Sequence, residues 1–83
     1  MEEAVMKIEI LGTGCPKCQS LARNAEQAVR EARVQAEIVK VTEIREIMKR
    51  GVMFTPALAI DGTVRSAGKV LDPEEIKKLF PAG

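Results

Sequence analysis

The stretch VMKIEILGTGCPKC, residues 5–18, decides the fold, because a strand pattern runs directly into a cysteine pair at the start of a helix pattern. Over residues 5–11 one side of the pattern is apolar and the other charged, which is the period of a β-strand: Met6, Ile8 and Ile10 alternate with Lys7 and Glu9. The run Gly12-Thr13-Gly14 ends this strand, so we predict a strand over Val5–Leu11 followed by a short loop.

Helical spacing begins at Pro16 and extends for about four turns. The apolar positions at this spacing are Leu21, Ala22, Ala25, Ala28, Val29 and Ala32. Pro16 suits a first helical turn, because the N–H that it lacks would have no helical partner there. Cys15 is therefore expected at the N-cap or first position of this helix, with Cys18 one turn further along.

A second strand and a second helix follow. The apolar run over Ala36–Val41 predicts a strand covered on both faces, and its place after a helix predicts parallel pairing with the first strand. Thr42 is expected to cap a short helix that ends at Gly51. That helix would carry the apolar residues Ile44, Ile47 and Met48.

The last third of the sequence predicts a hairpin and a third helix. Strands over Ala57–Ile60 and Thr63–Arg65 flank Asp61-Gly62, a pair typical of tight two-residue turns, so these strands should be antiparallel. Asp72 and Pro73 then give a cap and a first-turn proline. The third helix should bury Ile76, Leu79 and Phe80 and stop at Pro81.

The order of these elements predicts the architecture. It reads βαβαββα with no linker or repeat, which is most economically an α/β fold with a four-stranded mixed sheet and helices on both faces. Hydrophobic residues make up 46% of the 83 residues and charged residues 30%, a balance typical of folded proteins. So short a chain has room for one core, and we expect residues 1–83 to form a single domain.

The composition excludes several classes of function. Thirteen Lys and Arg against twelve Asp and Glu give a net charge of +1, which provides no one-sided positive surface for nucleic acid. Without His, catalytic triads, imidazole bases and His-bearing zinc sites are excluded. No apolar run approaches the roughly 18 residues of a membrane span, and no signal-peptide pattern opens the sequence. We expect a soluble, cytoplasmic protein.

Cys15 and Cys18 are the only cysteines, and their spacing favours redox chemistry. Residues three apart on a helix lie close enough to form a disulfide without unfolding. At a helix start the dipole and free N–H groups stabilise a thiolate, so thiols there titrate at about 3.5 to 7.5 instead of about 8.5. We expect Cys15 to be exposed and to attack a partner's disulfide, and Cys18 to be shielded and to resolve the mixed disulfide.

Two other interpretations of the cysteine pair remain open. Gly14-Cys15-Pro16-Lys17-Cys18 superficially matches the loop of small copper chaperones, whose two thiolates hold Cu(I), although their element order differs from this one. Alternatively, the domain could be a redox-silent module for partner recognition. Lys17, between the two cysteines, either lowers the pKa of the attacking thiol further or is only a solvated helix residue.

Together, these residues resemble the thioredoxin-like superfamily in its minimal form. The resemblance rests on Cys15-Pro16-Lys17-Cys18 after a first strand, Thr55-Pro56 before a later strand, and the Asp61-Gly62 hairpin, and it covers nearly the whole chain. In particular, the chain is similar to the small proteins known as redox-active disulfide protein 2. The resemblance implies a minimal thioredoxin fold and a thiol-disulfide oxidoreductase or electron carrier.

The resemblance also implies roles for three further residues. Thr55-Pro56 would be a cis bond facing the cysteines, with Thr55 pairing by strand addition with the extended segment of a substrate. Glu9 lies six residues before Cys15, where thioredoxins tend to hold a buried acid that moves the proton of the resolving thiol. From the pattern alone, Glu9 is more simply a residue of the polar strand face.

The expected partners follow from the same resemblance. They are disulfide-bearing client proteins and an upstream disulfide reductase, with the protein acting as a monomer. No cofactor is expected, because the dithiol is itself the redox group. Departures from the thioredoxin and glutaredoxin patterns, Gly14 before the first cysteine and a single Gly68 near the last helix, put glutathione binding in doubt.

Overall fold

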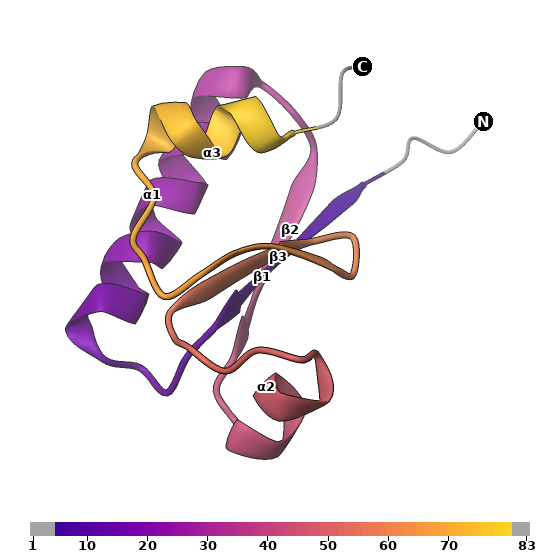
Figure 1. Ribbon diagram of the computed structural model, residues 1–83. Coiled ribbons are helices and arrows are strands. Elements are labelled where there is room, and N and C mark those ends of the chain that lie inside the picture. Colours follow the sequence, from indigo (N-terminus) through magenta and orange to yellow (C-terminus); the bar gives the residue numbers. More distant parts are fainter. Residues whose placement is uncertain (1–4, 81–83) are drawn as a thin grey trace.

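The computed structural model describes residues 5–80 and contains seven elements in the predicted order. They are β1 (Met6–Leu11), α1 (Pro16–Ala32), β2 (Ala36–Val41), α2 (Ile44–Lys49), β3 (Ala57–Ile60), β4 (Thr63–Ala67) and α3 (Pro73–Leu79). The four strands form one sheet in the order β2-β1-β3-β4 (Figure 1). β1 pairs parallel with β2 and antiparallel with β3, and β3 pairs antiparallel with β4. The predicted mixed sheet of a minimal thioredoxin fold is confirmed.

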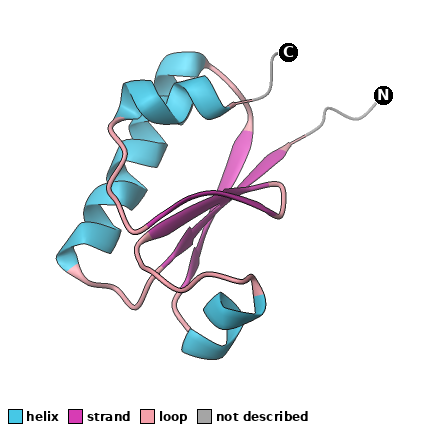
Figure 2. Cartoon of the chain, viewed as in Figure 1, coloured by secondary structure: helices cyan, strands magenta, loops and turns pink. Residues whose placement is uncertain are grey.

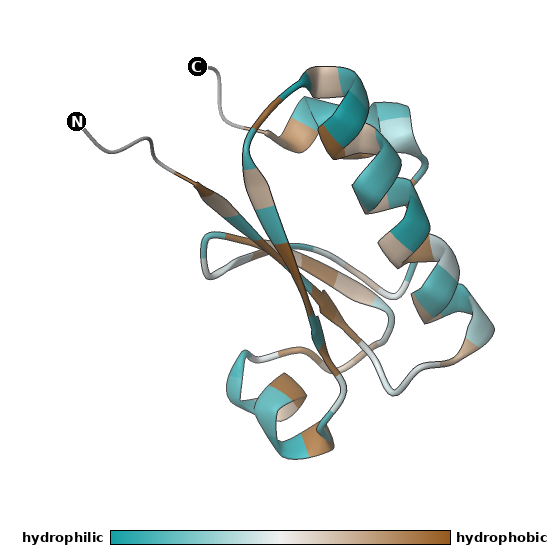
Figure 3. Ribbon diagram, turned by 180° about the vertical axis from the view of Figure 1, so that it is seen from behind, coloured by the Kyte–Doolittle hydropathy of each residue, from teal (hydrophilic) through white to brown (hydrophobic). Residues whose placement is uncertain are grey.

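Helices cover both faces of the sheet. On one face, α1 and α3 pack against Ile8 and Ile10 of β1 and Leu58 of β3. On the other face, the shorter α2 contributes Ile47, which packs with Leu11 and Val41. Figure 3 shows hydrophobic residues concentrated on the strands and hydrophilic residues on the outer side of α1. The face that carries α1 is called the α1 face below, and the opposite one the α2 face.

Local sequence explains where several elements begin and end. Asp72 caps α3 through its carboxylate, which accepts a hydrogen bond from the backbone N–H of Glu75 at 2.8 Å. The Glu75 carboxylate in turn accepts a hydrogen bond from the backbone N–H of Asp72 at 3.1 Å. Asp61 and Gly62 both have positive φ, as the predicted hairpin turn requires. The predicted stop at Pro81 lies outside the described residues.

Some predicted boundaries were wrong. Val5 lies outside β1, and β4 continues past Arg65 to Ala67. The N-cap of α2 is Glu43, without a side-chain cap, instead of Thr42. The reason is that the Val41 carbonyl still accepts a sheet-type hydrogen bond from the Gly12 N–H at 3.0 Å, so the chain leaves the sheet one residue later than a Thr42 cap requires.

β2 is also less covered than its apolar run predicted. It lies at the edge of the sheet, and Val41 is its only buried residue. Ile38 is half-buried against the core on the α1 face. Val39 is half-buried on the α2 face, because the six-residue α2 reaches only the end of the strand that carries Val41. Within the described part of the chain, no helix combines the length and apolar character needed to cross a bilayer.

Candidate functional site

Cys15 and Cys18 lie at the start of α1, where the loop from β1 enters the helix. Cys15 is the N-cap residue, with extended backbone at φ −67° and ψ 164°, and Pro16 follows it in the first turn, both as predicted. The Cys15 sulfur accepts a hydrogen bond from the backbone N–H of Cys18 at 3.4 Å, and the two sulfurs lie 2.8 Å apart. Cys15 and Cys18 are free cysteines in this structure.

The two sulfurs have different surroundings. Cys15 is partly exposed, whereas Cys18 is 5% exposed. The hydrogen bond from the Cys18 thiol, followed by the one from the Cys18 backbone N–H, lowers the pKa of Cys15 from that of an ordinary thiol. Burial and the same sulfur contact raise the pKa of Cys18. The thiolate therefore forms first on the more accessible sulfur, and the proton stays on Cys18.

Gly12 lies between Cys18 and the loop before β3, and its lack of a side chain lets the two approach each other. A Cβ atom added at Gly12 would overlap the Cys18 sulfur and would lie 3.9 Å from the Pro56 Cα atom, so only glycine fits between them. Thr55-Pro56 is a cis bond, as the family resemblance implied. Figure 2 shows the loop before α1 and the loop before β3 at the same end of the sheet. The structure thus brings Cys15, Cys18 and Pro56 into one site.

Thr55 and Lys17 lie at the surface of this site. Thr55 is exposed in the loop between α2 and β3, next to the buried Pro56. Lys17 is exposed in the first turn of α1, and its backbone N–H is one of the weaker causes that lower the pKa of Cys15. Thr55 therefore has the exposure that its predicted role in docking requires.

Glu9 lies on the opposite face of the sheet from the cysteines. It is 4% exposed, so it is not the solvent-facing strand residue that alternation with Lys7 indicated. Its carboxylate accepts a hydrogen bond from the Arg50 guanidinium at 2.7 Å, and this contact raises the pKa of Arg50. Arg50 caps the end of α2. The structure therefore joins Glu9 to α2, and it does not bring Glu9 together with Cys18.

An apolar groove of about 430 Å³ borders the site on its α2 side. We call it the α2 groove; it is lined by Thr13, Ile44, Ile47, Met48, Val52, Met53 and Thr55. Large hydrophobic side chains are exposed along it: Ile44 is 62%, Met48 66% and Met53 87% exposed. Because Thr13 lies in the loop that leads to Cys15 and Thr55 precedes Pro56, the groove borders the thiol site.

Sequence reasoning missed this groove. Ile44, Ile47 and Met48 were predicted as the apolar residues of this helix, with no distinction between those that reach the sheet and those that stay exposed. In the structure only Ile47 reaches the sheet, because α2 is short and touches it along a narrow strip. The signal that could have revealed the groove is the adjacent Met53-Phe54, two large apolar residues in a loop next to Thr55-Pro56.

The comparison with protein families gives a match to the thioredoxin domain over residues 6–81. This chain belongs to the thioredoxin family. A thioredoxin from Methanothermobacter thermautotrophicus is 45% identical over 76 residues, which cover 92% of this chain and 99% of that protein. A thioredoxin from Methanocaldococcus jannaschii is 44% identical over 78 residues, covering 94% of this chain and 90% of that protein.

Membership of the thioredoxin family confirms the enzyme class predicted from the cysteine motif. The protein is a thiol-disulfide oxidoreductase with a minimal thioredoxin fold. In this fold the sheet positions the β1–α1 loop and the loop before β3 beside each other, so the thiols meet the Pro56 loop although some forty residues of sequence separate them.

Proposed function

We propose that the protein reduces or exchanges disulfides of other proteins through Cys15 and Cys18. The Cys15 thiolate attacks one sulfur of a client disulfide, and the other client sulfur leaves with the electron pair and takes up a proton. The Cys18 thiolate then attacks Cys15, which forms the Cys15–Cys18 disulfide and releases the second client thiol. The client gains two electrons and two protons, and the dithiol loses them.

The observation that carries this proposal is the inequality of the two thiols at 2.8 Å. A partly exposed thiol with a lowered pKa suits attack on the client, and a buried thiol with a raised pKa suits the later, resolving step. The order of attack therefore follows from burial and hydrogen bonding around two otherwise identical side chains.

Client docking would use the loop before β3 and the α2 groove. We propose that the backbone at Thr55 pairs with an extended client segment by strand addition, with Pro56 beside the reacting sulfurs. An apolar client side chain near the disulfide would fill the α2 groove. Main-chain pairing selects no particular sequence, so this arrangement favours a broad range of clients.

The remaining parts of the reaction come from outside the domain. A disulfide reductase would regenerate the dithiol, no cofactor would be needed, and the cytoplasm, where thiols are kept reduced, would suit the reaction. Among residues 5–80 no group of three or more His, Cys, Asp or Glu side chains forms a metal-binding cluster. A Cu(I) carrier of the alternative kind would therefore depend on the two thiolates.

Insulin reduction by dithiothreitol tests the proposal against the alternatives. We expect the protein to accelerate it and to emerge metal-free from anaerobic purification. Stoichiometric Cu(I) without insulin reduction would support the metal carrier. The redox-silent module would be supported by two results together. The parent protein would not accelerate insulin reduction, and a variant that lacks both cysteines would keep the full affinity of the parent for client proteins.

The hydrogen bond between the thiols gives a prediction about pH. In Cys18→Ala the sulfur contact that contributes most to lowering the pKa of Cys15 is lost, so the pKa should rise and the midpoint of Cys15 alkylation by iodoacetamide should move to higher pH. In Cys18→Ser a hydroxyl can still donate this bond, and the midpoint should stay nearer that of the parent protein. Equal midpoints for the two variants would show that the sulfur contact does not set the pKa.

The α2 groove gives a prediction about clients. Met53→Ser removes the most exposed apolar side chain of the groove, so the KM for insulin should rise by about three- to tenfold. The rate with a small aromatic disulfide, which reaches Cys15 without filling the groove, should change less than twofold. A matched control is Val70→Ser, an exposed apolar residue outside the groove lining. An equal change in KM for both variants would contradict docking in the groove.

A further inference from the structure

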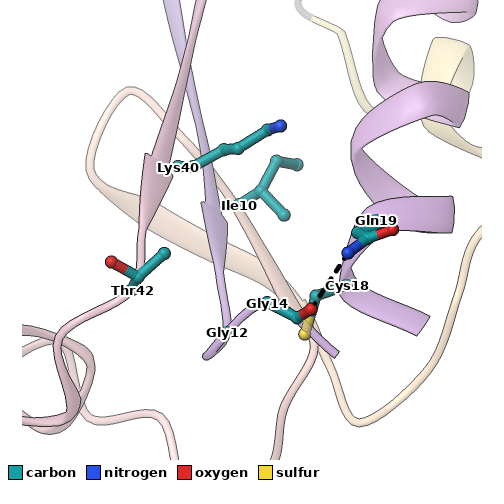
Figure 4. A pocket seen from close by; sticks show the side chains of 7 residues that line it. All are labelled: Ile10, Gly12, Gly14, Cys18, Gln19, Lys40 and Thr42. Atoms are coloured by element: carbon teal, nitrogen blue, oxygen red, sulfur yellow. Dashed lines mark hydrogen bonds between the residues drawn. The ribbon is translucent and has the colours of Figure 1, made fainter. Parts of the chain in front are cut away.

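Cys18 borders a small hollow on the α1 face, between α1 and the ends of β1 and β2. The hollow has a volume of about 140 Å³ and is lined by Ile10, Gly12, Gly14, Cys18, Gln19, Lys40 and Thr42 (Figure 4). A single water molecule needs roughly 10–15 Å³ of such space, so several fit. Cys18 is almost sealed from bulk solvent, and the lining of this hollow places the polar side chains of Gln19, Lys40 and Thr42 around the same space as its thiol.

Lys40 is the one charged side chain in the lining of this hollow. Lys40 and Ile10 are paired in the parallel register of β1 and β2, so their side chains share a face, and Figure 4 shows both extending from the strands on the α1 side. Gln19 donates a hydrogen bond to the Gly14 carbonyl at 3.2 Å and so forms a fixed wall. Lys40 is exposed and has the length to sample the hollow.

The other titratable and charged groups near Cys18 lie outside the lining of this hollow. At the start of α1, the N-cap residue Cys15 contacts Cys18, and Lys17 is exposed to solvent. The β1–α1 loop and the loop before β3 approach Cys18 with Gly12 and Pro56, which do not titrate. Glu9, the only buried charged residue in the described part of the chain, is on the α2 face in its contact with Arg50.

The resolving step requires the proton of Cys18 to leave. Only the thiolate of Cys18 attacks Cys15, and a thiolate in apolar surroundings is unfavourable. A nearby cation reduces this cost, and water in the hollow can carry the proton to solvent, while the departing client thiolate takes up a proton in turn. The hollow has room for water, and its lining contains one cationic side chain, that of Lys40.

We propose that Lys40 is a positioning residue for the resolving step, whose ammonium group stabilises the Cys18 thiolate through water in the hollow. The inference rests on the proposed function. It assigns the electrostatic support of Cys18 to the α1 face of the sheet, in place of the carboxylate of Glu9 on the other face.

Reaction of the reduced protein with 5,5′-dithiobis(2-nitrobenzoate) separates the two steps. Attack by Cys15 releases one thionitrobenzoate, and attack by Cys18 on the resulting mixed disulfide releases the second. In Lys40→Met we expect the second phase to be about three- to tenfold slower at pH 7, with its midpoint at higher pH and the first phase unchanged. Lys40→Arg keeps the charge and should keep both the rate and the pH profile.

Each outcome decides the proposal. A second phase in Lys40→Met that matches the parent protein in rate and pH profile would overturn it. Equal slowing of the second phase in Lys40→Met and Lys40→Arg would also overturn the proposal, because it would show that the shape of the Lys40 side chain matters and its charge does not. Glu9→Gln should leave the second phase unchanged, and slowing as large as in Lys40→Met would return the role to Glu9. A parent protein that releases no thionitrobenzoate at all would contradict the proposed function instead.

Discussion

Cys18→Ser is expected to abolish catalytic reduction of insulin and to leave the protein joined to its clients. Cys15 keeps its place at the N-cap of α1 and still attacks, but no second sulfur lies within reach of the mixed disulfide. Well-oriented intramolecular reactions reach effective concentrations of about 10⁵ M or more, which an external thiol at millimolar concentration cannot match. Turnover should therefore fall by at least about a hundredfold.

The measurement is insulin reduction followed by capture of covalent complexes on non-reducing gels. Cys18→Ser should form complexes that dithiothreitol dissolves, and Cys15→Ser should form none, because Cys18 is buried and its pKa is raised. Complexes of equal amount in both variants would mean that the two sulfurs are interchangeable. That result would contradict the order of attack proposed above, although the protein would still be an oxidoreductase.

The parts of the fold and site that depend on neighbours in sequence could be predicted. The period of residues 5–11, the cap and proline before α3, and the Asp61-Gly62 turn are local signals, and each corresponds to an observed element. The place of Cys15 at the helix start was predicted in the same way, because Pro16 and the glycine loop fix where α1 begins. Local chemistry was therefore enough to locate the reactive sulfur.

The parts that depend on distant residues could not be predicted from patterns. Glu9 alternates with apolar neighbours like a solvated residue, and only Arg50, forty-one positions later, makes its burial possible. Lys40 likewise comes near Cys18 only through the register of β1 with β2. A strand period specifies which residues share a face, but the elements that cover the face decide which side chains meet.

Arg50→Met is expected to destabilise the protein strongly. The Arg50 guanidinium holds the Glu9 carboxylate at 2.7 Å and donates to the Glu46 carbonyl at 3.0 Å, so it fastens the end of α2 to the sheet. Without it, Glu9 is a buried charge with its counter-ion removed, a loss that costs roughly 3–5 kcal/mol in fully buried pairs. Because the Arg50 side chain is 30% exposed, water offsets part of this cost, and we expect about 2–3 kcal/mol.

The free energy of unfolding in urea, followed by far-ultraviolet circular dichroism, measures this loss. Arg45→Met is the matched control, since Arg45 is an exposed arginine on the same helix and its removal should change stability by less than about 0.5 kcal/mol. The double variant Glu9→Leu with Arg50→Met should recover most of the loss, because no charge is then left buried alone. If Arg50→Met is no less stable than Arg45→Met, the pair does not hold α2 against the sheet. If the double variant recovers nothing, the loss in Arg50→Met comes from its contact with Glu46 and not from the charge of Glu9.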